Sequence, residues 1–115
     1  MRLALGGIAA VLASVGWPAA AQSPASAIDL FVRADKGHCI ACHQLPAGVG
    51  PATRSDLGPA LNGERMRALG RKAIAQVLED PQALNAETVM PPFGKHRILD
   101  AAEIARIAEF LHALP

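Results

Sequence analysis

Cys39-Ile40-Ala41-Cys42-His43 is the stretch that decides the fold, and it holds both cysteines of the chain. A Cys-x-x-Cys-His sequence is typical of covalent attachment of a c-type haem. Two thiols at this spacing can reach two vinyl groups on one edge of a porphyrin, and the imidazole that follows can bind the iron from the proximal side. We therefore predict one covalent haem c on Cys39 and Cys42, with His43 as an axial iron ligand.

Three other interpretations of this motif need different surroundings. A thioredoxin-like redox pair needs a preceding strand in a βαβ unit, and no strand-like run precedes residue 39. Half of a zinc site needs further ligands, but there is no other cysteine and the remaining histidines are scattered. A disulfide would suit an exported protein, yet it would leave His43 without a role. Haem attachment is the favoured interpretation.

The first 21 residues have the pattern of a secretory signal peptide. Arg2 forms a short positive region, residues 3–15 form an apolar run, and Ala19-Ala20-Ala21 is a small-residue cleavage signal. The apolar run is shorter than the roughly 20 residues of a transmembrane helix. We expect cleavage near Ala21/Gln22, a domain over residues 22–115, a periplasmic location and no stable membrane span. The alternative is an uncleaved N-terminal anchor.

Without residues 1–21 the charge of the chain is balanced. Only Arg2 is lost from eleven basic residues, which leaves ten basic and ten acidic residues. This balance gives no positive field for nucleic acid or an anionic membrane. The 94 residues that remain contain three aromatic side chains, all phenylalanine. A domain this small often needs a cofactor, metal or disulfide to complete its core, and a haem would supply the missing apolar bulk.

Hydrophobic periodicity predicts an all-α domain. We expect helices over residues 26–36, 64–69 and 71–79, and a last helix capped by Asp100 with its apolar stripe on Ile104, Ile107, Ala108 and Leu111. The first and last helices should cross near Phe31 and Phe110. The predicted fold class is therefore a class I cytochrome c-like fold, with three to five helices wrapped around one covalent haem.

The proximal side of the haem should be wrapped by residues 44–63, which are rich in proline and glycine and predict an irregular loop. The proximal imidazole needs a hydrogen-bond acceptor on its second nitrogen to fix its orientation. We expect that acceptor to be a carbonyl of the turn at residues 57–59, with the carbonyl of Pro59 favoured.

Met90 is the favoured sixth ligand of the iron. It precedes Pro91-Pro92, and this pair restricts the backbone and presents the thioether from an extended loop. Met66 falls in a predicted helix, where methionine usually fills gaps in a core. His96 is the other candidate, because His38 adjoins the haem motif and His112 should be solvated.

Ligation by histidine and methionine raises the reduction potential and leaves no open position on the iron. We therefore predict electron transfer without catalysis by this chain alone, and we assign no catalytic residue.

The C-terminal half resembles the SoxX family, the monohaem cytochrome c subunits of the periplasmic thiosulfate-oxidising system. The segments that carry this resemblance are Thr88-Val89-Met90-Pro91-Pro92-Phe93-Gly94, Ile98-Leu99, Glu103-Ile104 and Phe110-Leu111. The haem motif with Gln44-Leu45-Pro46, and later Gly58-Pro59, is also similar to that family. The resemblance covers nearly all of residues 22–115, and its most specific part is the Met-Pro-Pro-Phe-Gly loop.

The resemblance implies that Cys39 and Cys42 hold the haem and that His43 and Met90 are the axial ligands. It also implies a heterodimer with SoxA, a second c-type cytochrome whose haem site carries a reactive cysteine. Such a heterodimer is an L-cysteine S-thiosulfotransferase, which couples thiosulfate oxidatively to a cysteine of the carrier protein SoxYZ. This subunit would pass the electrons to a downstream cytochrome.

Two other functions remain open from the residues alone. A free-standing soluble cytochrome c that feeds an oxidase or reductase would be a monomer, usually with a stronger charge asymmetry for transient docking. A five-coordinate haem enzyme or gas sensor would need Met90 to be unligated. Lys95-His96-Arg97 and Arg71-Lys72 are small basic clusters that suit either partner docking or a solvated surface, and Arg54 is a candidate partner for a haem propionate.

Overall fold

The structure is a computed structural model that describes residues 23–115. The predicted signal peptide and the cleavage position near Ala21/Gln22 lie outside the described residues. Within residues 23–115 there are five α-helices, one short 3-10 helix and no strand, which confirms the all-α prediction. No helix in this part of the chain combines the length and the apolar composition that crossing a membrane requires.

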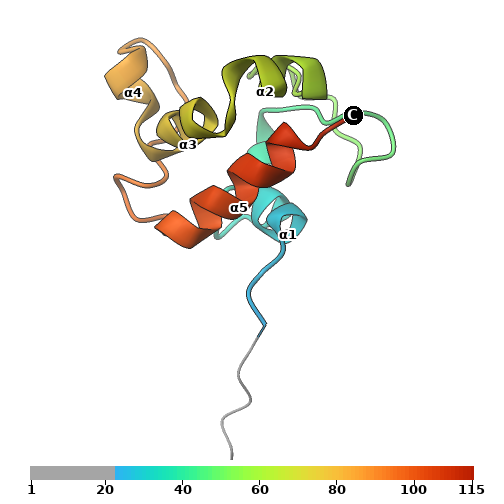
Figure 1. Ribbon diagram of the computed structural model, residues 1–115, viewed down its shortest axis with the longest axis horizontal. Helices are drawn as coiled ribbons and strands as arrows, with labels where there is room; N and C mark the ends of the chain where they lie inside the picture. The colour runs from blue at the N-terminus through green and yellow to red at the C-terminus, as the bar shows by residue number, and fades with distance from the viewer. Residues whose placement is uncertain (1–22) are drawn as a thin grey trace, which may run out of the picture.

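The last helix is the centre of the packing. In chain order the elements are α1 (Ala27–Val32), η1 (Cys39–Ala41), α2 (Gly63–Leu69), α3 (Arg71–Glu79), α4 (Pro81–Leu84) and α5 (Ala101–His112). Helix α5 packs against α1, α2 and α3. Figure 1 shows α5 running diagonally across the front of the domain, with α1 beneath its middle and α2, α3 and α4 along the opposite side.

Helix α5 forms where the sequence predicts it. The Asp100 carboxylate accepts the Glu103 backbone N–H at 2.8 Å, and the Glu103 carboxylate accepts the Asp100 N–H at 3.0 Å. This capping box satisfies two backbone donors at the helix start. The predicted stripe is buried as one face: Ile104, Ile107, Ala108 and Leu111. Leu114 continues this face beyond the helix and is also buried.

Helix α1 is shorter than predicted. Ser26 and Asp29 form the expected capping box, but the helix ends at Val32 and the prediction to Lys36 is wrong. Arg33 is extended, and the chain turns back so that the Gly37 N–H donates to the Leu30 carbonyl at 3.1 Å. The turn also carries the Lys36 ammonium to within 2.8 Å of the Glu103 carboxylate on α5. These contacts across the fold replace further helix.

Helices α1 and α5 meet through Phe31 and Phe110, as the sequence predicts. The ring centroids are 6.2 Å apart and the planes are inclined by 62°, which is an edge-to-face contact. Phe31 is fully buried. Aromatic pairs of this kind add about 1 kcal/mol beyond the burial of their area, so this pair fixes the crossing of the two helices.

The middle of the chain follows the sequence prediction with one addition. Helix α3 has the predicted bounds, α2 begins one residue earlier than predicted, and the loop over residues 44–62 is irregular. Helix α4 is not predicted. Pro81 ends α3 but starts α4, because proline has no backbone N–H to satisfy and suits the first turn of a helix.

Candidate functional site

Two cavities that share part of their lining occupy the middle of the domain, with volumes of about 380 and 300 Å³. Cys39, His43, Pro59 and Met90 line both of them. The first cavity also contains Cys42. The structure therefore brings together all five residues that the sequence analysis assigns to the haem site, although they span 52 positions from Cys39 to Met90. The second cavity continues inward among buried side chains of α2, α3 and α5.

The Cys-x-x-Cys-His motif is held in a tight turn. The backbone N–H groups of Cys42 and His43 both donate to the Cys39 carbonyl, at 3.1 and 2.8 Å. The Thr53 hydroxyl donates to the Ile40 carbonyl at 3.0 Å and ties the turn to the 44–62 loop. Both cysteines are free thiols. Cys39 is only 9% exposed, and this burial raises the pKa of its thiol to about 12 because desolvation disfavours the thiolate.

The imidazole of His43 is held by the Gly58-Pro59 turn. His43 Nδ1 lies 2.7 Å from the Pro59 carbonyl oxygen. A carbonyl can only accept a hydrogen bond, so Nδ1 carries the proton and Nε2 keeps its lone pair for a metal. The Gly58 N–H donates to the Cys42 carbonyl at 2.8 Å, which fixes the turn against the haem motif.

Gly58 lies flat against the ring of His43. A Cβ atom at this position would meet the ring atoms Cε1, Nδ1 and Nε2, all closer than the 3.0 Å that real Cβ atoms keep. Only glycine leaves room for the imidazole here. The sequence analysis names Pro59 as the acceptor, but it does not find this contact, because a glycine next to a proline in a loop also fits an ordinary turn.

Met90 is carried by a loop that is anchored on both sides. Its N–H donates to the Thr88 hydroxyl at 3.2 Å, and its carbonyl accepts from the Gln82 amide of α4 at 3.1 Å. Further along, the Gly94 N–H donates to the Leu78 carbonyl of α3 at 3.2 Å. The sequence offered no signal for Gln82, because its contact depends on the unpredicted helix α4. Met90 itself is half-buried and packs against the core.

The rival ligands lie in different positions. Met66 is buried in the core and also lines the second cavity from α2. His38 is exposed at the first cavity, whereas His96 is exposed and lines neither cavity. His112, on the last turn of α5, is half-buried and also lines neither cavity.

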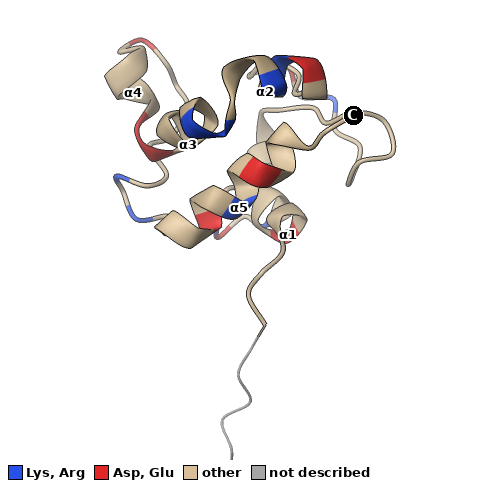
Figure 2. Cartoon of the chain, in the orientation of Figure 1, with Lys and Arg blue, Asp and Glu red and all other residues tan. Residues whose placement is uncertain are grey.

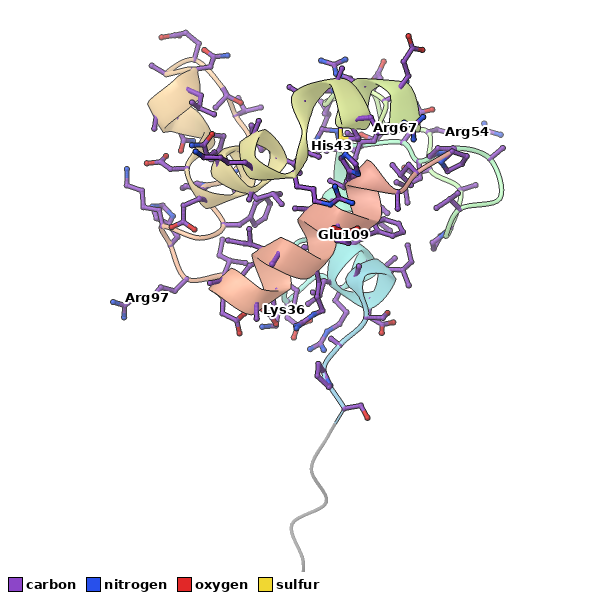
Figure 3. All side chains as sticks on the ribbon, viewed as in Figure 1. Lys36, His43, Arg54, Arg67, Arg97 and Glu109 are labelled. Carbon is purple, nitrogen blue, oxygen red and sulfur yellow. The ribbon has the colours of Figure 1, made fainter. Side chains whose placement is uncertain are left out.

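The basic residues outside the motif are dispersed. Figure 2 shows Lys and Arg interspersed with Asp and Glu over the described chain. Lys95 pairs with Asp80 at 2.9 Å, and Arg71 pairs with Glu109. Arg54 is exposed on the 44–62 loop, projects outward in Figure 3 and lines neither cavity. Arg97 lies on the loop before α5 and also points away from the domain in that view.

The site fits one covalently attached haem. Its lining is predominantly apolar, two thiols lie in a five-residue motif, and an imidazole nitrogen and a thioether sulfur border the same cavity. Methionine and histidine are ligands that proteins use for haem iron. The Gly58 backbone lies so close to the imidazole of His43 that no residue with a Cβ atom fits at position 58. An all-α fold with this site is that of a c-type cytochrome.

The comparison of the chain with known families agrees with the site. The family model described as cytochrome c oxidase, cbb3-type, subunit III matches residues 22–111, and the chain belongs to this family of cytochrome c domains. A comparison with curated proteins finds no match. The protein is therefore an electron-transfer c-type cytochrome with one covalently bound haem c, as the sequence analysis predicts. This match is to the cytochrome c family at large and does not single out SoxX.

Proposed function

We propose that this cytochrome is the electron-accepting subunit of a SoxAX-type L-cysteine S-thiosulfotransferase in thiosulfate oxidation. In this proposal Cys39 and Cys42 hold the haem, His43 and Met90 bind its iron, and Pro59 orients His43. The observation that carries the proposal is the Met-Pro-Pro-Phe-Gly loop of residues 90–94, which has the most specific resemblance to SoxX and supplies Met90, Pro91 and Phe93 to the first cavity.

The proposed reaction needs an electron acceptor of this kind. A carrier cysteine thiol and thiosulfate form a cysteine S-thiosulfonate and release one proton and two electrons. Bound haem supplies one-electron chemistry, so the two electrons would leave one at a time. His43 and Met90 are far apart in the sequence, and both line the two cavities. In this proposal the sulfur chemistry belongs to a reactive cysteine of the SoxA-type partner.

An uncharged rim around the first cavity supports a lasting partner. None of the residues that line this cavity is Lys, Arg, Asp or Glu. Two of them, Leu57 and Val89, are large hydrophobic residues that are 75% and 88% exposed. Transient electron-transfer partners rely on complementary charge, whereas the central part of a lasting interface is apolar and depleted in charge. The balanced charge and this rim fit a SoxA-type heterodimer.

The name of the matching family supports a second candidate function. That family is described as subunit III of a cbb3-type cytochrome c oxidase. A cytochrome of this kind that passes electrons to an oxidase would use the same haem site. It would not need thiosulfate, a carrier protein or a second haem chain with a reactive cysteine, and this difference separates the two candidates.

The decisive experiment is a mild purification of the native protein from the periplasm, followed by addition of thiosulfate with the SoxYZ-type carrier. We expect a second haem-binding chain to co-elute and haem reduction to require that chain. Val89→Asp should abolish the co-elution. Leu84→Asp is the matched control, because Leu84 is 64% exposed on α4 but lines neither cavity.

A lone monomer that thiosulfate and carrier cannot reduce, even with a SoxA-type protein supplied, would overturn the proposal. Oxidation of that monomer by a terminal oxidase would then establish the second candidate. The proposed location is tested separately by sequencing the mature N-terminus. A start at Gln22 supports cleavage and export, whereas a start at Met1 supports the retained anchor.

A further inference from the structure

We infer that Gln82 is a positioning residue for Met90, and that it sets how readily another ligand can displace the Met90 thioether from the iron. This inference rests on the axial ligation that the proposed function assigns. Gln82 lies on α4 and lines neither cavity. Its side-chain amide donates to the Met90 carbonyl at 3.1 Å, so any effect of Gln82 on the haem site passes through Met90.

The carbonyl of Met90 is held differently from the two carbonyls that follow it. The Pro91 carbonyl accepts from the Phe93 N–H of the same loop at 3.0 Å. The Pro92 carbonyl accepts from the His96 N–H at 2.9 Å. The Met90 carbonyl accepts instead from a side chain of another element, and this bond is partly buried. Its loss would leave an acceptor with reduced access to water, which carries a desolvation penalty.

The other polar backbone group of Met90 is held from the same side. The Met90 N–H donates to the Thr88 hydroxyl at 3.2 Å. Thr88 is fixed to the end of α4, because its own N–H donates to the Asn85 carbonyl at 3.1 Å. Both polar groups of the Met90 backbone therefore depend on one short segment, residues 82–88. Together with the restriction from the following proline, these bonds fix the point from which the thioether projects.

The loop is anchored independently beyond the two prolines. The Gly94 N–H donates to the Leu78 carbonyl at 3.2 Å, at the end of α3. The Lys95 N–H donates to the Glu79 carbonyl at 3.0 Å. These bonds do not involve α4. Removal of the α4 amide should therefore loosen the methionine side of the loop and leave its attachment to α3 in place.

The test measures imidazole binding to the ferric holoprotein by visible spectroscopy at neutral pH. Imidazole can bind the iron only in molecules whose Met90 has moved away, so its association constant follows the fraction of such molecules. In Gln82→Leu, which keeps a similar volume but has no donor, that constant should rise roughly three- to tenfold, the effect of one lost hydrogen bond. Gln76→Leu is the matched control, because Gln76 is exposed on α3 and lines neither cavity.

Two variants of Thr88 separate the hydrogen bonds from a general loss of packing. Thr88→Val keeps the shape of the side chain without the hydroxyl, so it should also raise the association constant of imidazole. Thr88→Ser keeps the hydroxyl and should bind imidazole like wild type. Equal binding by these two variants would contradict the role of the hydrogen bonds. If Gln82→Leu does not mature into holoprotein, Gln82→Glu replaces it, because a carboxylate has the same length but offers only acceptors. Loss of holoprotein in both Gln82 variants would show that Gln82 acts in folding, which overturns the inference.

Met90→Leu separates failure of this inference from failure of the ligand assignment. If Met90→Leu binds imidazole far more tightly than wild type while Gln82→Leu binds like Gln76→Leu, Met90 is the ligand and the role of Gln82 is overturned. If Met90→Leu also binds like wild type, Met90 is not the ligand and the inference is overturned with that assignment. None of these measurements needs thiosulfate or a partner chain, so their outcomes are distinct from those that test the SoxAX-type heterodimer.

Discussion

Gly58→Ala is the sharpest single test of how the proximal histidine is held. Gly58 does not have the positive φ that only glycine tolerates easily, so alanine has no backbone penalty there. In open space the substitution would even stabilise the protein by about 0.4–1 kcal/mol, because it restricts the unfolded chain. Any loss of stability must therefore come from the contact between the new methyl group and the imidazole of His43.

The size of that loss can be worked from the contacts. The new Cβ atom would lie 2.7 Å from His43 Nδ1, and ordinary van der Waals contact begins at 3.4 Å. The ring must therefore move by at least about 0.7 Å, away from a hydrogen bond of 2.7 Å to Pro59. Overpacking of this kind costs roughly 1–3 kcal/mol, and weakening the hydrogen bond adds about 1 kcal/mol. We expect a total loss of roughly 2–4 kcal/mol.

The assay combines thermal unfolding with visible spectroscopy of the holoprotein. A loss of this size lowers the melting temperature of a domain of about 90 residues by roughly 10–25 °C. Because the imidazole is displaced, the ferric spectrum and the reduction potential should change as well. Gly48→Ala is the control: its φ is +82° with no atom within 4 Å, so it should cost roughly 1–2 kcal/mol of backbone strain and leave the spectrum unchanged.

A Gly58→Ala protein with wild-type stability and spectrum would refute this reasoning. It would mean that the imidazole does not lie against the Gly58 backbone. A protein with lower stability but an unchanged spectrum would show that the methyl group displaces the loop and leaves the histidine in position.

Three further predictions test other parts of the structure. Met90→Leu should lower the reduction potential and allow carbon monoxide to bind the reduced haem without displacing a ligand. Met66→Leu should keep the wild-type spectrum and lower the stability by less than about 1.5 kcal/mol, and visible spectra recorded with and without carbon monoxide distinguish the two variants. The hydrogen bond from Lys36 lowers the pKa of Glu103 below its ordinary value of 4.5, so the carboxylate contributes its full stability above pH 4.5 and loses it as the pH falls through the lowered pKa. Urea unfolding should show Glu103→Gln about 1–2 kcal/mol less stable than wild type at neutral pH, and this difference in stability should close in acid. A difference that persists in acid would contradict a role for the charged Glu103. Phe31→Leu should cost about 1–1.5 kcal/mol by urea unfolding, since it removes the edge-to-face contact with α5 and leaves a small void, and a change below the error of the measurement would show that the ring does not fix the crossing.

Several features of this cytochrome depend on short stretches of sequence and were predictable for that reason. The five-residue haem motif contains its own geometry, because thiols and imidazole are neighbours along the chain. The bounds of α3 and the cap of α5 come from residues within one helical turn of each other. The contact of Phe31 with Phe110 follows from the apolar faces of the first and last helices, which the periodicity of the sequence already shows.

Other features were decided by contacts between distant residues. Helix α1 ends at Val32, and the turn after it pairs Lys36 with Glu103, 67 positions away. Helical propensity alone contains no information about that pair. Helix α4, whose Gln82 holds the carbonyl of Met90, starts at a proline that also serves as the stop of α3. Proline can both end one helix and begin the next, so Pro81 alone did not predict α4.

The sequence by itself determined the class of protein and its cofactor, because the haem motif is local and chemically specific. It also named five of the residues that line the first cavity: Cys39, Cys42, His43, Pro59 and Met90. Only the tertiary structure decided how closely Gly58 approaches His43, and which arginine borders the cavity. In the sequence Arg54 and Arg65 are both arginines with no feature that separates them, yet Arg65 lines the second cavity and Arg54 lines neither cavity. They differ in where a loop and a helix cap carry them, and that is set by packing across the whole domain.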